Sequence, residues 1–171
     1  CLFYSPMEDN TIWAPWRAGF VFGEKEDGCV FCNRISRAED SVDNLIVHRG
    51  RLNVVILNKY PYNPGHSMVV PIRHVGEIEE LTLEEAAEFF ELTRLTVRMM
   101  KQAYHPHSFN LGMNIGRASG AGIPEHVHMH MVPRWIGDTN FMPVIGKTKI
   151  MSVPLDMVYE SLRRAFQREQ A

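Results

Sequence analysis

Cysteine is scarce in this chain, and long apolar segments are missing. Three of the 171 residues are cysteines, Cys1, Cys29 and Cys32. An odd number with one close pair is poor material for a disulfide framework and better suited to metal binding or redox chemistry. No apolar run approaches the about 20 residues of a membrane span, and the first residues lack the pattern of a secretory leader. We therefore expect a cytoplasmic protein with no membrane partner.

A large charge of either sign is also missing. The 18 Lys and Arg residues nearly balance the 20 Asp and Glu residues. Proteins that bind a nucleic acid polymer usually carry a clear basic excess, so we expect no such partner. A small anionic ligand is still compatible, because it needs only a few local hydrogen-bond donors. With 45% hydrophobic residues, the chain is long enough for one domain with its own core.

Three histidines alternate with apolar residues at positions 126–130, in the order His-Val-His-Met-His. In a β-strand, His126, His128 and His130 would project from one face and the apolar residues from the other. Successive histidines would lie about 6.5 Å apart, which a phosphate chain or a metal shell can bridge. Imidazole serves as nucleophile, base or acid near neutral pH. This segment is therefore the main candidate for an active site.

Two other interpretations of the three histidines stay open. The segment can be a half-buried strand with an idle polar face, or the three imidazoles can hold a catalytic zinc ion. A glycine-rich stretch lies directly upstream at residues 112–122. Glycines let backbone amides approach and bind an anion, although the stretch can also be an ordinary hairpin connection.

The remaining strand signals predict an α+β fold. Apolar runs at 44–48, 52–57, 66–72 and 108–114 are typical of strands, and Gly50 joins the first two as a hairpin. Two prolines and a glycine make 58–65 a loop. Hairpin-connected strands with one dominant helix favour an antiparallel sheet that is covered by the helix on one face.

One long helix is predicted with clear ends. Thr82 and Glu85 form a capping box that begins it, and Pro106 ends it after Tyr104. Its apolar stripe is predicted to contain Leu83, Ala86, Phe90, Val97 and Met100. A second, C-terminal helix is expected at 154–167, with Pro154 in its first turn. We divide the chain into an N-terminal arm at 1–22, which contains two tryptophans, a catalytic domain at 23–145 and a C-terminal segment at 146–171.

The histidine segment resembles the signature of the histidine triad (HIT) family of nucleotide hydrolases and transferases. The similarity continues in Pro-Gly-His-Ser-Met-Val-Val-Pro-Ile-Arg-His at 64–74 and in Pro-Arg-Trp at 133–135, so it spans most of residues 29–140. Trp-Ala-Pro-Trp-Arg at 13–17 and Gly-Asp-Thr-Asn-Phe at 137–141 are similar to the bacterial branch that includes diadenosine tetraphosphate phosphorylases.

This resemblance implies a five-stranded antiparallel sheet, a homodimer and a nucleotidyl-histidine intermediate. His128 would be the nucleophile, because a neutral imidazole attacks phosphorus without prior deprotonation. His130 would contact the transferring phosphate or the leaving oxygen as donor or general acid. His66 would orient the triad from the neighbouring strand. Inorganic phosphate as second acceptor gives phosphorolysis, best assigned to diadenosine tetraphosphate, and water gives hydrolysis.

The resemblance also implies the residues that bind the nucleotide. Those that would bind phosphate are Asn114, Ser119, Gly120 and Gly122. Asn58 occupies the position where relatives bind the ribose hydroxyls, commonly with Asp. Several relatives carry Gln or Ser just before the triad, whereas residues 122–125 here are Gly-Ile-Pro-Glu. The group that activates the second acceptor is therefore not identified.

Cys29 and Cys32 have the two-residue spacing of one half of a zinc site. The resemblance implies that His74 and His126 complete a closed, structural zinc site beside the nucleophile. A redox pair and two unliganded core thiols are the other interpretations of the cysteines. Two alternative functions stay open, namely a zinc-stabilised nucleotide-binding module with little turnover and a HIT hydrolase of nucleoside phosphoramidates.

Overall fold

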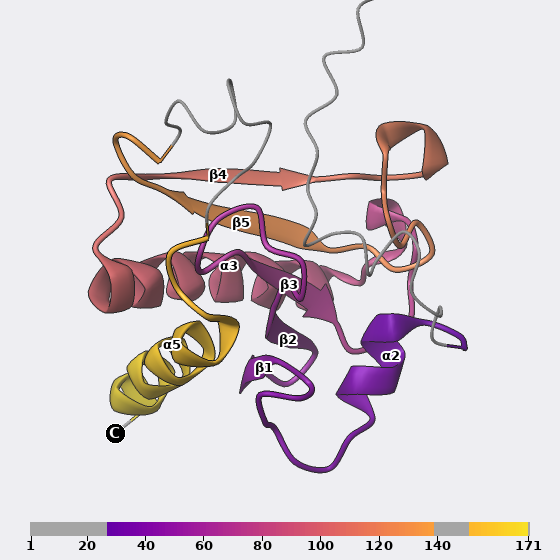
Figure 1. The fold of residues 1–171 in the computed structure, drawn as a ribbon. Coiled ribbons are helices and arrows are strands. Elements are labelled where there is room, and N and C mark those ends of the chain that lie inside the picture. Colours follow the sequence, from indigo (N-terminus) through magenta and orange to yellow (C-terminus); the bar gives the residue numbers. More distant parts are fainter. Residues whose placement is uncertain (1–26, 139–150, 171) are drawn as a thin grey trace, which may run out of the picture.

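The computed structural model of the protein describes residues 27–138 and 151–170 and shows one sheet flanked by helices (Figure 1). The predicted arm at 1–22 lies outside the described residues, and so does the expected boundary near residue 145. The division into three segments therefore stays a prediction. Among the described helices, none has the length and apolar character needed to cross a bilayer.

The sheet has five antiparallel strands in the order β1-β2-β3-β5-β4. The strands are β1 (Ile46–Arg49), β2 (Asn53–Leu57), β3 (Ser67–Pro71), β4 (Ser108–Met113) and β5 (Met129–Arg134). Gly50 lies in the connection between the first two, where its N–H donates to the Asn53 carbonyl oxygen at 2.8 Å. The predicted α+β class and all four upstream strands are confirmed.

The long helix α3 (Leu83–Tyr104) begins and ends where the sequence predicts. The Glu85 N–H donates to Thr82 Oγ1 at 3.2 Å, and the Thr82 N–H donates to Glu85 Oε2 at 2.8 Å, which completes the capping box. At the other end, His105 adopts a left-handed conformation with φ of 48°. The helix ends there because Pro106 cannot continue the hydrogen-bond ladder.

The predicted apolar stripe of α3 is wrong in phase, although its last member, Met100, is buried as expected. Leu83 is 91% exposed and Phe90 is 61% exposed. The side chains that face the sheet are instead Glu85, Phe89, Leu92, Thr93, Thr96, Met99 and Met100. This face is hard to recognise in the sequence because it includes polar residues. Its two threonines can be buried because their hydroxyl groups donate to carbonyl oxygens four residues earlier in the helix.

Two further α-helices lie within the described residues. The C-terminal helix α5 (Leu155–Gln170) confirms the expected helix and extends beyond its expected end. The six-residue helix α2 (Val30–Ile35), which follows Cys29, is not predicted by the sequence. A helix this short covers fewer than two turns, so it leaves no apolar periodicity to detect. Short 3-10 turns complete the structure at η2 (Ile78–Glu80) and η3 (Arg117–Ser119).

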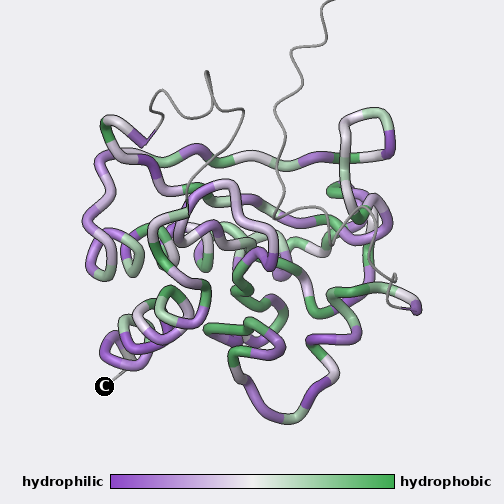
Figure 2. Tube along the Cα trace, viewed as in Figure 1, coloured by the Kyte–Doolittle hydropathy of each residue, from purple (hydrophilic) through white to green (hydrophobic). Residues whose placement is uncertain are grey.

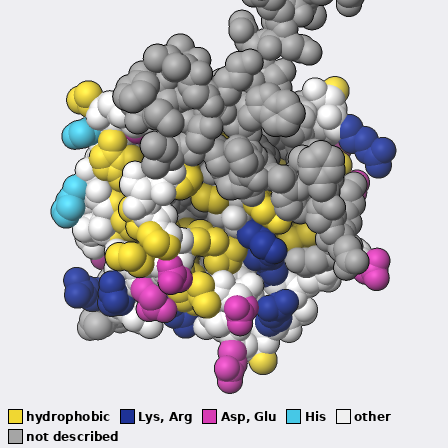
Figure 3. Space-filling model, viewed as in Figure 1, with side chains coloured by type: hydrophobic (Ala, Val, Ile, Leu, Met, Phe, Trp, Pro, Cys, Tyr) yellow, Lys and Arg dark blue, Asp and Glu magenta, His cyan; other side chains and the backbone are white. Residues whose placement is uncertain are grey.

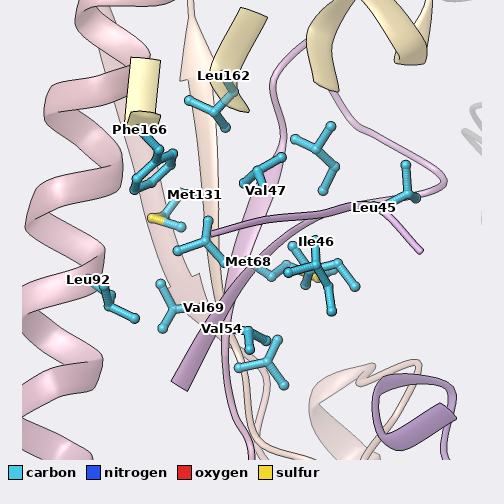
Figure 4. Close-up of a cluster of buried hydrophobic side chains, with 14 of the residues drawn as sticks. Leu45, Ile46, Val47, Val54, Met68, Val69, Leu92, Met131, Leu162 and Phe166 are labelled. Atoms are coloured by element: carbon cyan, nitrogen blue, oxygen red, sulfur yellow. The ribbon is translucent and has the colours of Figure 1, made fainter. Parts of the chain in front are cut away.

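The core lies between the sheet and the helices α3 and α5. Helix α3 packs on β2, β3 and β5, whereas α5 packs on α3 and β1. Every residue of β2 and β3 is buried. Figure 2 shows hydrophobic residues concentrated along these central strands, and Figure 4 shows Leu92, Leu162 and Phe166 converging on Val69 and Met131 from the helices. Each fully buried side chain of this size contributes about 1.5–3 kcal/mol.

Helix α5 also covers a histidine of β1. His48 is half-buried, and its ring stacks on Phe166 with 4.6 Å between centroids. Burial lowers the pKa of His48. His105 and His107 are exposed. On the face seen in Figure 3, acidic and basic side chains lie beside one another, in keeping with the balanced composition.

Candidate active site

The three histidines do not form one regular strand. Strand β5 begins at Met129, so His126 and His128 precede it and only His130 lies within it. The Val127 N–H donates to the Val75 carbonyl oxygen at 2.8 Å, and His126, Val127 and His128 are all buried. The prediction of an exposed histidine face opposite an apolar face is therefore wrong. Residues 126–128 lie before the first residue of β5 and outside its hydrogen-bond ladder, so their side chains need not alternate between two faces.

His128 has a defined protonation pattern. Its Nδ1 lies 2.8 Å from the His126 carbonyl oxygen, which can only accept, so Nδ1 carries the proton and Nε2 carries the lone pair. Burial lowers the pKa of His128, which favours this neutral form. Phe31 of α2 packs against the imidazole with 5.0 Å between centroids. The residue is 4% exposed, so only a small part of its side chain is accessible.

Nε2 of His128 nevertheless reaches the surface. It makes no hydrogen bond within the described residues, and the only fully buried side-chain polar atom there without a partner is Asn53 Oδ1. The lone-pair nitrogen of the imidazole is therefore not fully buried. The ring of His130 stands beside it, with 4.7 Å between centroids and 77° between planes.

His66 and His130 are joined by a hydrogen bond whose donor and acceptor can be assigned. The Tyr62 N–H donates to Nδ1 of His66 at 3.1 Å, so a neutral His66 carries its proton on Nε2. This Nε2 lies 2.9 Å from Nδ1 of His130 and donates to it. A neutral His130 then carries its own proton on Nε2. The structure thus brings a lone pair on His128 and an N–H donor on His130 to one place, which disfavours the idle-strand interpretation.

His126 faces away from this pair toward a group of metal ligands. Cys29 Sγ lies 3.3 Å from His126 Nδ1, and Cys32 Sγ lies 3.4 Å from His74 Nδ1. The four ligand atoms of Cys29, Cys32, His74 and His126 all lie within 4.8 Å of one another, and these residues could hold a metal ion. No cluster of three or more ligands that contains His128 or His130 occurs among the described residues, so the structure does not support a zinc ion held by the triad.

The ring of His126 has the protonation that a metal ligand needs. Nε2 of His126 lies 2.9 Å from the Pro71 carbonyl oxygen, so it holds the proton and leaves the Nδ1 lone pair for coordination. Burial lowers the pKa of His126 to about 4, while burial and the neighbouring Cys29 raise the pKa of Cys32. Neither cysteine forms a disulfide. A buried neutral imidazole beside two thiols is a fitting donor set for a metal ion.

The glycine-rich loop is open, in contrast to His128. Gly116 and Gly120 have φ values of 73° and 80°, and a Cβ added at either would meet no atom within 4 Å. Ser119 Oγ donates to the Gly116 carbonyl oxygen at 2.7 Å, which shapes the η3 turn. Gly120 and Gly122 are exposed and Asn114 is half-buried. The loop therefore has room for a ligand next to its backbone.

Asn58 lies at the end of β2, where its side chain is already partly engaged. Its Oδ1 accepts from the Tyr60 N–H at 2.8 Å, and its Nδ2 lies 3.7 Å from Met68 Sδ. The amide can thus offer a donor to a hydroxyl group more readily than an acceptor.

Sequence reasoning missed four residues that shape the site. They are Phe31, Tyr62, Asn63 and Asp138. Phe31 could have been noticed from its position between the two cysteines. Tyr62 acts through its backbone N–H, and the contacts of Asn63 and Asp138 join segments 75 residues apart, so neither the residue types nor the spacing mark them.

The chain is similar to known proteins over much of its length. The HIT domain model matches residues 25–135. An AP-4-A phosphorylase from Mycobacterium tuberculosis is 49% identical over 109 residues, which cover 64% of this chain and 56% of that protein. A bis(5'-nucleosyl)-tetraphosphatase (asymmetrical) from Schizosaccharomyces pombe is 30% identical over 93 residues, covering 54% of this chain and 50% of that enzyme. The chain thus spans about half the length of these enzymes.

Solved structures share the fold. A Zn-bound histidine triad family protein from Mycobacterium smegmatis has a TM-score of 0.68 at 23% identity and covers 84% of this chain and 96% of its own. A hypothetical histidine triad nucleotide-binding protein from Sulfolobus tokodaii has a TM-score of 0.67 at 26% identity and covers 83% and 94%. The matched model spans more than half of the chain and includes every triad histidine, so this protein belongs to the HIT domain family.

Proposed function

We propose that this protein cleaves dinucleoside polyphosphates, with diadenosine tetraphosphate as the best candidate, through a nucleotidyl group carried on Nε2 of His128. One observation carries the proposal. The His126 carbonyl oxygen holds the proton of His128 on Nδ1, so the nitrogen that reaches the surface is the nucleophilic one. The enzymes that this chain is similar to support the substrate class.

The first step joins His128 to the nucleotide. The Nε2 lone pair attacks the α-phosphorus, a P–N bond forms, and the bond from phosphorus to the bridging oxygen breaks. The departing oxygen takes the electron pair and accepts a hydrogen bond or the proton from Nε2 of His130. The imidazole of His128 becomes positively charged, and the His126 carbonyl oxygen at 2.8 Å stabilises that charge.

The second step releases the nucleotide. An oxygen of inorganic phosphate attacks the same phosphorus, the P–N bond breaks, and His128 returns to its neutral form. The product is then a nucleoside diphosphate, whereas water as acceptor would give a nucleoside monophosphate. A doubly negative phosphate has a nucleophilic oxygen without losing a proton. Phosphorolysis therefore fits a site in which Gly-Ile-Pro-Glu replaces the Gln or Ser before the triad.

The open loop is the proposed phosphate cradle. Backbone amides around Gly120 and Gly122, together with Asn114 and Ser119, would donate to phosphate oxygens, and the space at Gly116 and Gly120 admits them. Asn58 would donate its amide to a ribose hydroxyl. These assignments are proposals that rest on the exposed loop and on the free space above it.

Zinc is the proposed ion for the Cys29, Cys32, His74 and His126 cluster. Around a tetrahedral zinc ion, Zn–S bonds of about 2.3 Å and Zn–N bonds of about 2.1 Å place the ligand atoms about 3.4–3.8 Å apart. The separations of 3.3, 3.4 and 3.7 Å between sulfur and nitrogen atoms match that geometry. Zinc bound there would be structural, and its ligands would hold α2 against the segment that precedes β5.

A homodimer and a cytoplasmic location complete the proposal. β4 is one of the two edge strands of the sheet, and no described strand pairs with its outer side, which offers a backbone edge to a second copy. Leu111 on this strand is 51% exposed, and Ile115 just beyond it is 38% exposed. The reduced Cys29 and Cys32 suit the cytoplasm.

A product assay tests the proposed reaction. The full chain is incubated with diadenosine tetraphosphate, with and without inorganic phosphate, and products are separated by ion-exchange chromatography. We expect ADP and ATP only when phosphate is present. AMP without phosphate would assign water as the acceptor, and the absence of any product in both reactions would contradict the proposal.

A nucleotide-binding module with little turnover is the second candidate. The observation that favours it is the 4% exposure of His128, which restricts in-line attack. Tight nucleotide binding by calorimetry with no product and no covalent adduct by mass spectrometry would support it. Adduct formation from a nucleoside phosphoramidate but not from a dinucleoside polyphosphate would instead support the phosphoramidate hydrolase.

A further inference from the structure

The loop between β2 and β3 controls the donor side of the active site. Within it, Tyr62 does two things to His66. Its N–H donates to Nδ1 at 3.1 Å, and its ring stacks on the imidazole with 4.8 Å between centroids and 20° between planes. The tautomer of His66, and through it that of His130, therefore depends on where this loop holds the Tyr62 backbone.

Asn63 holds that loop from the inside. The residue is 2% exposed, and its carbonyl oxygen accepts from the His66 N–H at 3.1 Å. Its side-chain Nδ2 donates to the Pro133 carbonyl oxygen at 3.0 Å and to Asp138 Oδ2 at 2.8 Å. One buried amide thus ties the residues that flank His66 to the end of β5 and to the turn beyond it.

Asp138 is the fixed point to which Asn63 is tied. Its carboxylate accepts from Arg134 Nε at 2.6 Å and Nη2 at 2.9 Å, and from the Trp135 N–H at 3.2 Å. Arg134 is held in turn by Asn110 Oδ1 of β4 at 2.9 Å. Charge-assisted bidentate contacts of this kind are the strongest side-chain hydrogen bonds, so the carboxylate has little freedom to move.

We propose that Asn63 and Asp138 are positioning residues for the reaction, acting through the Tyr62 N–H on the tautomers of His66 and His130. The inference rests on the proposed function, because the proton on Nε2 of His130 that these residues would maintain is the donor in the proposed mechanism. Neither residue needs to touch substrate. If the loop shifts, Nδ1 of His66 loses its donor, the proton can move to that nitrogen, and Nε2 of His66 stops donating to His130.

The substitution Asp138→Asn tests this inference in the full chain. It preserves shape but turns one acceptor oxygen into a donor amide facing Arg134 or Asn63. The matched control is Asp40→Asn, because Asp40 pairs with Arg49 at 2.8 Å and its side chain is 16% exposed, against 13% for Asp138. The control pair lies before and in β1, outside the site.

Two readouts are recorded for each variant. Steady-state kinetics use diadenosine tetraphosphate with inorganic phosphate, and two-bond ¹H–¹⁵N NMR reports which nitrogen of each histidine carries the proton. For Asp138→Asn we expect kcat to fall about tenfold to a hundredfold with KM within about twofold of wild type. We also expect the single Nε2–H tautomer of His66 and His130 to become a mixture. Asp40→Asn should change neither readout.

The two proposals can fail separately. A folded Asp138→Asn variant with wild-type kcat and unchanged histidine signals would overturn the inference, and so would a loss confined to KM. Absence of turnover in the wild type would overturn the proposed function, while the NMR signals would still test the positioning. If Asp138→Asn does not fold, judged by circular dichroism, Asn63→Ala is used with the same expected results.

Discussion

His128 and His130 lie side by side, yet opposite hydrogen bonds set their chemistry. Nδ1 of His128 donates to a backbone carbonyl oxygen at 2.8 Å, whereas Nδ1 of His130 accepts from His66 at 2.9 Å. The first contact leaves a lone pair on Nε2 of His128, and the second leaves a proton on Nε2 of His130. In the proposed mechanism, these partners of the Nδ1 atoms make one of two identical side chains the nucleophile and the other the donor.

The largest effect is expected from removing the nucleophile. His128→Ala should lower kcat at least about 10⁴-fold, because no other described group offers a lone pair at that place. Mass spectrometry should detect a nucleotide adduct in the wild type and none in the variant, and circular dichroism should show a preserved fold. An adduct retained in His128→Ala would refute the assignment.

Breaking the donor side alone should cost less. His66→Leu removes the proton that is donated to His130 and should lower kcat about 10²-fold. His66→Gln retains an N–H that can reach Nδ1 of His130, so it should recover part of that loss. Adduct formation measured in a single turnover compares the three proteins. Equal rates in the Leu and Gln variants would show that the donated hydrogen bond is irrelevant.

Metal removal sharpens the comparison, because His126 contributes the carbonyl oxygen that orients His128. Cys29→Ser and Cys32→Ser should each abolish binding of one zinc per chain, measured by native mass spectrometry. They should also lower the melting temperature by several degrees, since metal binding energy is folding energy. A wild-type protein that binds no zinc after refolding with the metal would contradict the assignment.

The smallest effect concerns a buried and an exposed carboxylate in the first turn of α3. Arg73 holds the pKa of Glu85 at about 2. The Glu85 side chain is 7% exposed and that of Arg73 is 47% exposed, whereas Glu84 is 72% exposed in its pair with Arg51. The lowered pKa means that this stabilisation is complete above about pH 4.5 and is lost as the pH falls toward 2.

Substitution of the two carboxylates should therefore differ. Glu85→Gln should lower the melting temperature at pH 7 by about 2–4 °C, with a smaller difference from wild type at pH 3. Glu84→Gln should change it by less than about 1 °C, because exposed pairs contribute little. Thermal unfolding followed by circular dichroism at both pH values checks this, and equal effects of the two substitutions would contradict it.

Local signals in the sequence were sufficient to predict most of the helices and strands. The capping box at Thr82 and Glu85, the turn at Gly50 and the proline at 106 act within a few residues, so their meaning does not depend on the rest of the chain. The prediction of the buried face of α3 was wrong because this face contains two threonines and a glutamate, which are polar residues and do not mark a buried face in the sequence. The prediction of a strand through all three histidines was wrong because the Val127 N–H donates to the carbonyl oxygen of Val75, which lies 52 residues away in the sequence.

The sequence by itself determined that imidazoles, thiols and open glycines would occur in this chain, and its motifs were enough to place it in the HIT domain family. Only the tertiary structure decided which nitrogen of each histidine carries the proton. The Pro71 carbonyl oxygen that contacts His126 comes from a segment 55 residues away. The Tyr62 N–H and the His126 carbonyl oxygen are near His66 and His128 in sequence, but the fold sets their orientation toward the rings. An imidazole has two nearly equivalent nitrogens, so its chemistry is undefined until the fold supplies a donor or an acceptor to one of them.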